Sequence, residues 1–158
     1  MAAIYQLRTS QKINASIDQV WEFISSPRNL KKITPAHMGF QITNEPIADK
    51  MYAGMIIAYK VSPILGIPMD WVTEITHVQE KEYFVDEQRV GPYSIWHHQH
   101  KIIPISGGVL MEDIVSYKPP FGFLGSIANG LLIQRQLKSI FDFRFLAMEK
   151  EFGKWGES

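Results

Sequence analysis

Alternating hydrophobic and polar positions predict β-strands along most of the chain. The expected strands are residues 3–13, 40–43, 55–61, 70–78, 83–90, 94–103 and 109–117. The turns between the later strands are short and rich in Gly and Pro, as at residues 91–92 and 106–108. Successive strands joined by short turns pair antiparallel, so this part of the chain is predicted to form a meander.

Helical spacing of apolar residues occurs near the first strand and at the C-terminal end. Ser16 or Asp18 can cap a short helix whose apolar face includes Trp21, and Pro27 can begin a second short helix over residues 27–33. A long helix is expected from about residue 126 to Phe152, with Gly153 as its stop.

Two features weaken the expected start of the long helix. Residues 121–125 follow two prolines and can form a flexible lead-in. Gly130 lowers helix propensity and is compatible with a bend or a close approach.

The predicted sheet has an apolar face that must be buried, and the long C-terminal helix is the only predicted element long enough to cover it. An antiparallel sheet with one apolar face must cover that face, and a helix of this length reaches about 40 Å. We therefore expect an α+β fold, a single domain over residues 1–158, in which a curved sheet surrounds the C-terminal helix. Side chains alone often cannot fill such a space, so an internal cavity is predicted.

Composition limits the classes of partner. The 158 residues are 46% apolar and 20% charged, and sixteen Lys and Arg balance sixteen Asp and Glu. This balance favours one globular domain and argues against nucleic acid as a partner. No Cys is present, no apolar run reaches the length of a membrane span, and the N-terminus lacks an apolar leader. We expect a cytoplasmic protein without stable membrane insertion, either a monomer or a homodimer.

Polar residues occupy positions on two strands where the pattern predicts an inward face. Trp96, His98 and His100 share one face of their strand, and Asp113 and Tyr117 share the mostly apolar face of the next. A two-residue loop at positions 106–107 sets His100 opposite Asp113. A loop at 107–108 would move the partners by two residues and keep the same faces, whereas a one-residue slip would bring in Glu112 instead.

Two further positions carry candidate polar groups. The turn at residues 91–92 can bring Asp86 near His98 and Gln88 near Trp96, although periodicity alone does not decide which face of that strand points inward.

Arg144 lies on or beside the apolar stripe of the long helix, where an unpaired guanidinium is costly. We predict that Arg144 pairs with an acidic group or a carbonyl, or faces a ligand.

Three segments and the element order resemble a known superfamily. The segments are VWEFISSPRNLKKITP at 20–35, DEQRVGPYSIWHHQH at 86–100 and EDIVSYKPPFGFLG at 112–125, with IFDFR at 140–144 behind the last. They resemble the START/polyketide-cyclase-like (SRPBCC) superfamily, and within it a bacterial branch of ligand-binding domains with no assigned reaction. The resemblance implies the helix-grip fold, a seven-stranded antiparallel sheet around the C-terminal helix, and inward positions for Asp86 and Gln88. The superfamily includes lipid carriers, hormone receptors, cyclases and stress proteins, so the fold does not select a function.

The first functional hypothesis is the binding of a small hydrophobic molecule, lipid-like, aromatic or polyketide-like, in the cavity. Loops around residues 63–68 and 119–125 would form its gate. The expected ligand-binding residues are Asp86, Gln88, Trp96, His98, His100, Asp113, Tyr117, Phe141 and Arg144.

Other hypotheses use the same polar residues differently. His98, His100 and Asp113 are the candidate catalytic residues of a cyclase, dehydratase or hydrolase that works by general acid–base catalysis. The same three can instead form a buried structural network, and a third class of hypothesis is a regulatory protein that pairs through a strand edge. Alternating His can chelate a metal, but no third ligand is secured by the pattern, so neither a metal nor another cofactor is expected.

Overall fold

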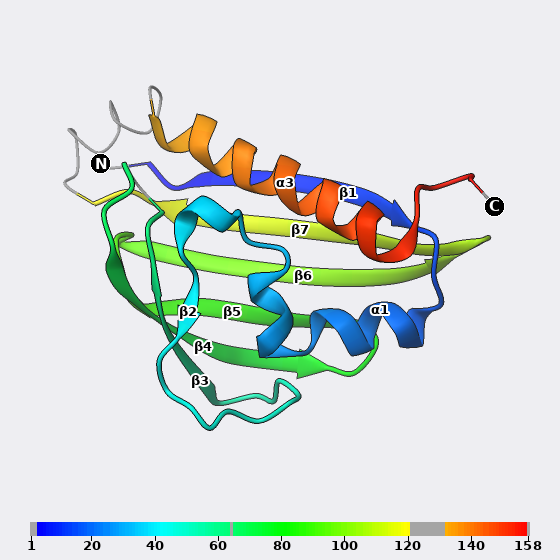
Figure 1. Ribbon diagram of the computed structural model, residues 1–158, viewed down its shortest axis with the longest axis horizontal. Helices are drawn as coiled ribbons and strands as arrows, with labels where there is room; N and C mark the ends of the chain where they lie inside the picture. Colours follow the sequence, from blue (N-terminus) through cyan, green and yellow to red (C-terminus); the bar gives the residue numbers. More distant parts are fainter. Residues whose placement is uncertain (1–2, 64, 121–131, 158) are drawn as a thin grey trace.

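The described residues form a seven-stranded antiparallel sheet that curves around a long C-terminal helix (Figure 1). The computed structural model describes residues 3–63, 65–120 and 132–157. The sheet order is β1-β7-β6-β5-β4-β3-β2, and every neighbouring pair is antiparallel. The strands are β1 (Tyr5–Ile13), β2 (Gln41–Ile42), β3 (Met55–Val61), β4 (Met69–Gln79), β5 (Tyr83–Val90), β6 (Ile95–Ile105) and β7 (Gly108–Lys118). The predicted α+β helix-grip architecture is confirmed.

The connection between β1 and β2 contains one α-helix and two short 3₁₀ helices. Helix α1 spans Ile17–Ile24, and Ser16 caps it in a capping box with Gln19. The expected second helix over residues 27–33 is a 3₁₀ helix, η1 (Pro27–Lys31), followed by η2 (Ala36–Met38). No side-chain cap stabilises either 3₁₀ helix, which is consistent with their shortness.

Helix α3 (Gln134–Phe152) lies across the inner face of the sheet and ends before Gly153, as predicted (Figure 1). Its buried line is Leu137, Phe141, Arg144 and Met148, at spacings of three and four residues. Phe145, next to Arg144 on the same helix, does not belong to this line and has 43% of its surface exposed. The predicted helix start near residue 126, the lead-in at 121–125 and Gly130 lie outside the described residues.

A tight hairpin fixes the pairing of β6 with β7. Ile105 pairs with Gly108, and Gly107 has a φ of 84° that favours glycine. A Cβ atom on Gly108 would lie 2.1 Å from the carbonyl oxygen of Ile13, so only glycine fits between the hairpin and β1. The resulting register places His100 opposite Asp113, as the sequence predicted.

The core consists of two clusters of buried apolar side chains. The first, here called the α1 cluster, comprises Ile13, Val20, Trp21, Phe23, Ile24, Ile33, Ile47, Met51, Met55, Ile57, Ile75, Phe84, Ile102, Val109, Met111 and Met148. The second, here called the aromatic cluster, comprises Met38, Phe40, Val61, Trp71, Tyr93, Val115, Tyr117, Ile133, Leu137 and Phe141.

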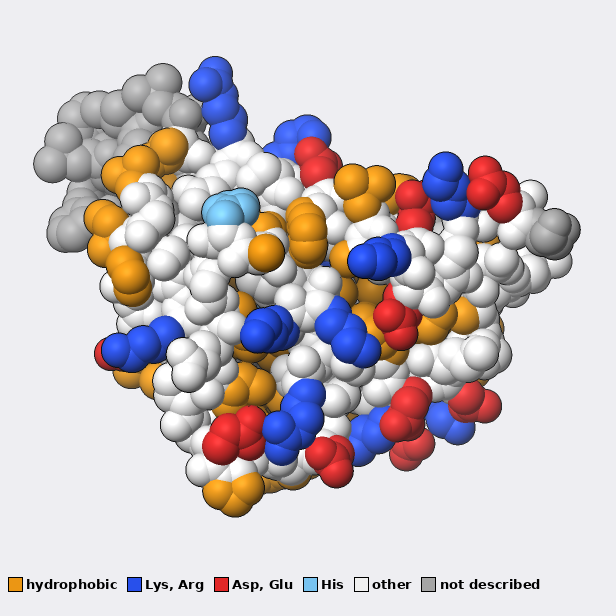
Figure 2. All heavy atoms as spheres, in the orientation of Figure 1, with side chains coloured by type: hydrophobic (Ala, Val, Ile, Leu, Met, Phe, Trp, Pro, Cys, Tyr) orange, Lys and Arg blue, Asp and Glu red, His pale blue; other side chains and the backbone are white. Residues whose placement is uncertain are grey.

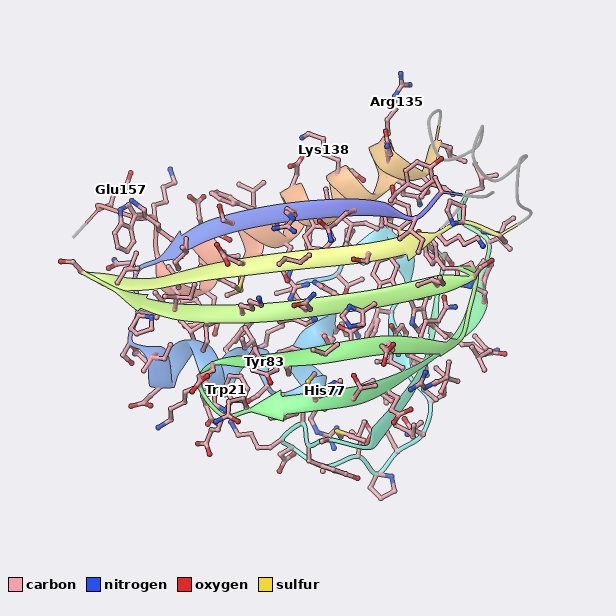
Figure 3. The ribbon with its side chains drawn as sticks, turned by 180° about the vertical axis from the view of Figure 1, so that it is seen from behind. Trp21, His77, Tyr83, Arg135, Lys138 and Glu157 are labelled. Carbon is pink, nitrogen blue, oxygen red and sulfur yellow. The ribbon has the colours of Figure 1, made fainter. Side chains whose placement is uncertain are left out.

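The surface carries charges of both signs. On the face seen in Figure 2, Lys and Arg are interspersed with Asp and Glu, and hydrophobic side chains reach the surface between them. Figure 3 shows the outer face of the sheet, with His77 and Tyr83 on it and Arg135 and Lys138 projecting from α3 away from the sheet. No helix in the described ranges combines the length and apolar character needed to cross a membrane.

Candidate functional site

A cavity of about 140 Å³ lies between the inner face of the sheet, α3 and the segment that carries η1 and η2. Most of its wall is aliphatic or aromatic, and one part is polar. The lining side chains are Leu30, Thr34, Met38, Phe40, Met51, Ile57, Tyr59, Val61, Pro63, Trp71, Thr73, Ile75, Phe84, Asp86, Tyr93, Trp96, His98, His100, Leu137, Ile140, Phe141 and Arg144.

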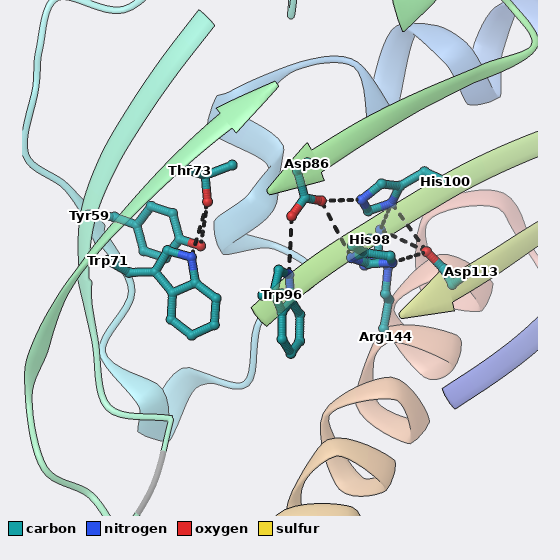
Figure 4. Close-up of polar contacts among 9 residues, drawn as sticks. All are labelled: Tyr59, Trp71, Thr73, Asp86, Trp96, His98, His100, Asp113 and Arg144. Atoms are coloured by element: carbon teal, nitrogen blue, oxygen red, sulfur yellow. Dashed lines mark hydrogen bonds and ion pairs between the residues drawn. The ribbon is translucent and has the colours of Figure 1, made fainter. Parts of the chain in front are cut away.

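The polar side chains of the wall come from the neighbouring strands β5 and β6, and β7 supplies Asp113 behind them. The β5–β6 pairing places Asp86 opposite His98, and the β6–β7 pairing places His100 opposite Asp113. Because side chains alternate along each strand, His98 and His100 both point inward while His97 faces the other side. Four ionisable groups from three strands therefore meet at one point on the inner face (Figure 4).

The two imidazoles and two carboxylates form a compact network (Figure 4). His98 Nε2 lies 2.8 Å from Asp113 Oδ1, and His98 Nδ1 lies 3.4 Å from Asp86 Oδ2. His100 Nε2 lies 2.5 Å from Asp86 Oδ2, and His100 Nδ1 lies 3.2 Å from Asp113 Oδ1. The centroids of the two imidazole rings are 3.6 Å apart. We call Asp86, His98, His100 and Asp113 the His–Asp cluster.

Arg144 reaches the His–Asp cluster from α3. Its Nη2 lies 3.2 Å from His100 Nδ1 and 3.8 Å from Asp113 Oδ1, which confirms the predicted pairing with an acidic group. Arg144 is buried and also lines the cavity. Its Nε is the one buried side-chain nitrogen or oxygen without a hydrogen-bond partner among the described residues.

The surroundings keep both carboxylates ionised. Burial has the largest influence on the pKa of Asp113 and acts to raise it, but the charge of Arg144 and the close contacts with both imidazoles outweigh it. The pKa of Asp113 is therefore held well below its usual range. Burial likewise opposes ionisation of Asp86, and the adjacent His98 and His100, with the Trp96 N–H, bring its pKa below the ordinary value.

His98 is held neutral near pH 7. Burial, followed by the repulsion of a charge on His100, lowers the pKa of His98 to about 4, against the opposing influence of Asp86 and Asp113. A neutral imidazole has one N–H to donate and one nitrogen lone pair that can accept a hydrogen bond or bind a cation.

Aromatic residues with polar tips form the wall next to the His–Asp cluster. The indole N–H of Trp96 donates to Asp86 Oδ1 at 3.2 Å, and that of Trp71 donates to Thr73 Oγ1 at 3.1 Å. The Tyr59 hydroxyl shares a hydrogen bond of 3.3 Å with the same Thr73 oxygen. These bonds fix the ring orientations, so the shape of the cavity is set before any ligand enters.

Three of the predicted site residues do not belong to the cavity wall formed by the described residues. Asp113 stands behind the imidazoles, and Tyr117 is buried against Tyr5 and Tyr93. Gln88 folds back onto the turn after β5, where its amide donates to the carbonyl of Tyr93 and accepts from its N–H. Gln88 is still a residue of β5 and pairs with Thr73 of β4, but the β5–β6 pairing ends at Glu87, and the side chain of Gln88 bonds to the turn that follows the strand.

Several cavity residues were not singled out as site residues from the sequence. Thr34, Tyr59, Thr73 and Tyr93 are those among them that carry a hydroxyl group. Thr73 occupies an inward position of the alternating β4 pattern, which was a usable signal. Tyr93 lies in a turn, where no periodic signal exists.

Comparison with solved structures supports the fold. A protein of Chromobacterium violaceum superimposes with a TM-score of 0.70 at 11% identity, covering 94% of this chain and 97% of that one. The major latex-like protein 151 of Panax ginseng gives a TM-score of 0.69 at 13% identity, covering 94% and 97%. A protein from Rhizobium leguminosarum gives 0.66 at 14% identity, covering 95% and 97%.

Sequence comparison adds no assignment. No family model matches the chain, and no curated protein sequence matches it. The structural likenesses agree with the helix-grip fold that the resemblance implied, and at these identities they show the fold alone.

Proposed function

We propose that this protein binds a small, largely apolar organic molecule in the cavity beneath α3. The observation that carries the proposal is the cavity itself: about 140 Å³ of space beneath α3, with a mostly apolar wall and polar groups gathered on one side. A concave, mostly apolar pocket with a few convergent polar groups is the usual form of a small-molecule site. The helix-grip fold is compatible with this role, because a curved sheet around one helix encloses space.

The volume sets the size of the ligand. An apolar cavity of about 150 Å³ can hold a single benzene ring. A molecule of one substituted ring therefore fits the 140 Å³ here, whereas a long acyl chain would require the walls to move. The aromatic side chains of Trp71, Tyr93 and Trp96 offer ring faces and edges to such a molecule.

The polar side sets the orientation of the ligand. His98, His100 and Arg144 line the cavity, and the Arg144 Nε–H has no partner in the described residues. A hydroxyl, carbonyl or carboxylate on the ring would accept from this donor, and Asp86 would hold the imidazoles in place. Asp113 acts through the imidazoles because it does not reach the cavity wall.

A direct test measures binding of one-ring probes, p-cresol and benzoate, by isothermal titration calorimetry, with palmitate as a long-chain comparison. Ile140→Trp places a large ring at a half-buried position of the wall, and we expect it to weaken probe binding about tenfold or more. Phe143→Trp adds the same ring to the exposed side of the same helix and should leave binding unchanged. Equal affinities in the two variants, or no binding of either probe to the wild type, would contradict the proposal.

A second candidate function, general acid–base catalysis on a bound carbonyl compound, is favoured by one observation. Both imidazoles lie in the cavity wall, where a ligand would contact them. The low pKa of His98 makes it a weak base at neutral pH, which leaves His100 as the better candidate. Turnover of a bound carbonyl compound that is lost in His100→Ala with the fold intact would support catalysis; unchanged turnover would exclude this role for His100.

A further inference from the structure

The His–Asp cluster has more close nitrogen–oxygen contacts than its imidazoles have protons. Four imidazole nitrogens face carboxylate oxygens, at 2.5, 2.8, 3.2 and 3.4 Å. Two neutral imidazoles supply only two N–H donors, which suit the two shortest contacts. The other two contacts then join a nitrogen lone pair to a carboxylate oxygen, an unfavourable arrangement in a buried site.

Two additional positive charges would make all four contacts favourable. Protonation of both imidazoles would supply them, but the ring centroids lie 3.6 Å apart and two imidazolium charges at that separation repel strongly. Arg144 makes only one of the two unfavourable contacts acceptable, because its Nη2–H donates to the lone pair of His100 Nδ1 at 3.2 Å. One divalent cation supplies both charges at a single point.

We propose that Asp86, His98 and His100 bind a divalent first-row transition metal ion, with Asp113 as the supporting carboxylate. One ligand atom from each of the three residues lies within 4.8 Å of the other two. The nitrogens that face Asp86 Oδ2 are His98 Nδ1 and His100 Nε2. Around a tetrahedral ion with bonds of about 2.1 Å, ligand atoms lie about 3.4 Å apart. The His98–Asp86 distance already has this value, and the His100–Asp86 distance must open by about 1 Å.

The second carboxylate supports this assignment independently. In metal sites, a ligating histidine commonly donates its other ring N–H to a carboxylate, which fixes the tautomer and the ring orientation. Asp113 Oδ1 lies 2.8 Å from His98 Nε2 and 3.2 Å from His100 Nδ1, the two nitrogens that do not face Asp86. A single buried carboxylate thus orients both imidazoles toward one point. The proton that His100 Nδ1 then carries replaces the hydrogen bond that this nitrogen accepts from Arg144 Nη2 in the metal-free protein, and Arg144, 3.8 Å from Asp113 Oδ1, balances the charge of that carboxylate.

The ligand set selects the class of metal. Two imidazole nitrogens and one carboxylate suit zinc, cobalt, iron or manganese rather than calcium or magnesium, which prefer oxygen ligands. Asp86, His98 and His100 all line the cavity, so a remaining coordination position faces it. The sequence pattern secured only two of the three ligands, which is why no metal was expected; the β5–β6 register supplies Asp86 as the third.

The test uses the full-length protein, stripped with EDTA and titrated with Zn²⁺ by calorimetry without any organic ligand. We expect one ion per chain, and about a 100-fold or larger loss of affinity in Asp86→Asn, which keeps the side-chain shape and removes the charge. Asp113→Asn should lose about 10–100-fold and change the visible absorption spectrum of the Co²⁺ form, because the imidazoles lose their orienting partner.

Control variants separate this site from other histidines and from folding defects. His77 and His97 lie together on the outer face of the sheet, so the double variant His77→Ala/His97→Ala should bind Zn²⁺ as the wild type does. If Asp86→Asn loses its native circular dichroism, His100→Gln replaces it. As a second readout, excess Zn²⁺ at 100 times Kd should raise the Tm of the wild type by about 5–10 °C.

Three results would overturn the metal proposal. These are no Zn²⁺ binding by the wild type, unchanged affinity in a folded Asp86→Asn or His100→Gln variant, and loss of binding in the outer-face control. Metal binding and probe binding are measured separately, so failure of one leaves the other standing.

Discussion

The α1 cluster and the aromatic cluster form one core but differ in what they leave between their side chains. Branched and flexible aliphatic groups predominate in the α1 cluster, and Val20, Ile57, Val109 and Met148 show no exposed surface. Half of the ten side chains of the aromatic cluster are rings, those of Phe40, Trp71, Tyr93, Tyr117 and Phe141. The aromatic cluster supplies seven side chains to the cavity wall and the α1 cluster supplies four, so more of the open space borders the aromatic cluster.

The His–Asp cluster lies where these two regions meet. His100 stacks on Phe84 of the α1 cluster at 4.0 Å between ring centroids, and His98 contacts the edge of Phe141 of the aromatic cluster at 5.6 Å. Phe84 and Phe141 both line the cavity, so each region supports the network and also borders the open space. The fully buried side chains of the α1 cluster provide rigidity, the aromatic cluster provides more of the cavity wall, and a binding site needs both.

The largest effect on stability should come from removing the positive charge of Arg144, which lies beside the His–Asp cluster. Arg144→Met leaves Asp113 buried and uncompensated, and we expect a loss of about 3–5 kcal/mol in the free energy of unfolding by urea. The double variant with Asp113→Asn should recover part of the loss. Arg135→Met, at an exposed site on the same helix, should change stability by less than about 0.5 kcal/mol. A loss in Arg144→Met as small as in this control would show that the cluster needs no buried cation.

Truncation of methionines compares the packing of the two regions directly. Met148→Ala removes a fully buried side chain from the α1 cluster and should cost about 2–5 kcal/mol. Met38→Ala, in the cavity wall, should cost about 1–2 kcal/mol less because open space already borders that side chain. Leu146→Ala, 63% exposed, is the control for α3. Equal losses in the free energy of unfolding for Met148→Ala and Met38→Ala, measured by chemical denaturation, would contradict the proposed difference in packing between the two clusters.

A smaller effect should follow from removing one hydroxyl from the aromatic wall. Thr73→Val deprives the Trp71 N–H and the Tyr59 hydroxyl of their shared partner, and should cost about 1–3 kcal/mol. Thr76→Val, partly exposed on the same strand, should cost less than about 0.5 kcal/mol. If thermal unfolding shows no difference between the two variants, these hydrogen bonds do not stabilise the cavity wall.

Features with a local signal could be predicted from the sequence. Alternation and the Gly107 hairpin predicted the register of His100 with Asp113, and helical spacing predicted that Arg144 would need a partner. Both depend on nearest neighbours along a strand or helix, which periodicity describes well.

Features that depend on packing between distant segments could not be predicted from the pattern. The alternation of β5 does not decide whether Asp86 points inward, and the side chain of Gln88 bonds to Tyr93 in the turn after the strand instead of lining the cavity. Tyr59 and Tyr93 reach the cavity through the curvature of the sheet and the path of a loop. The size of the cavity depends on how well rings interlock, which no one-dimensional pattern records.

The contact between Gly108 and Ile13 has a consequence far from the turn where it occurs. A side chain at Gly108 would force the hairpin or β1 to shift, and a shift of one residue in the β6–β7 register would exchange the two faces of β7. Glu112 would then replace Asp113 inside the core. Gly108 has no side chain, yet by holding this register it helps to determine which acidic residue is buried further along the same strand.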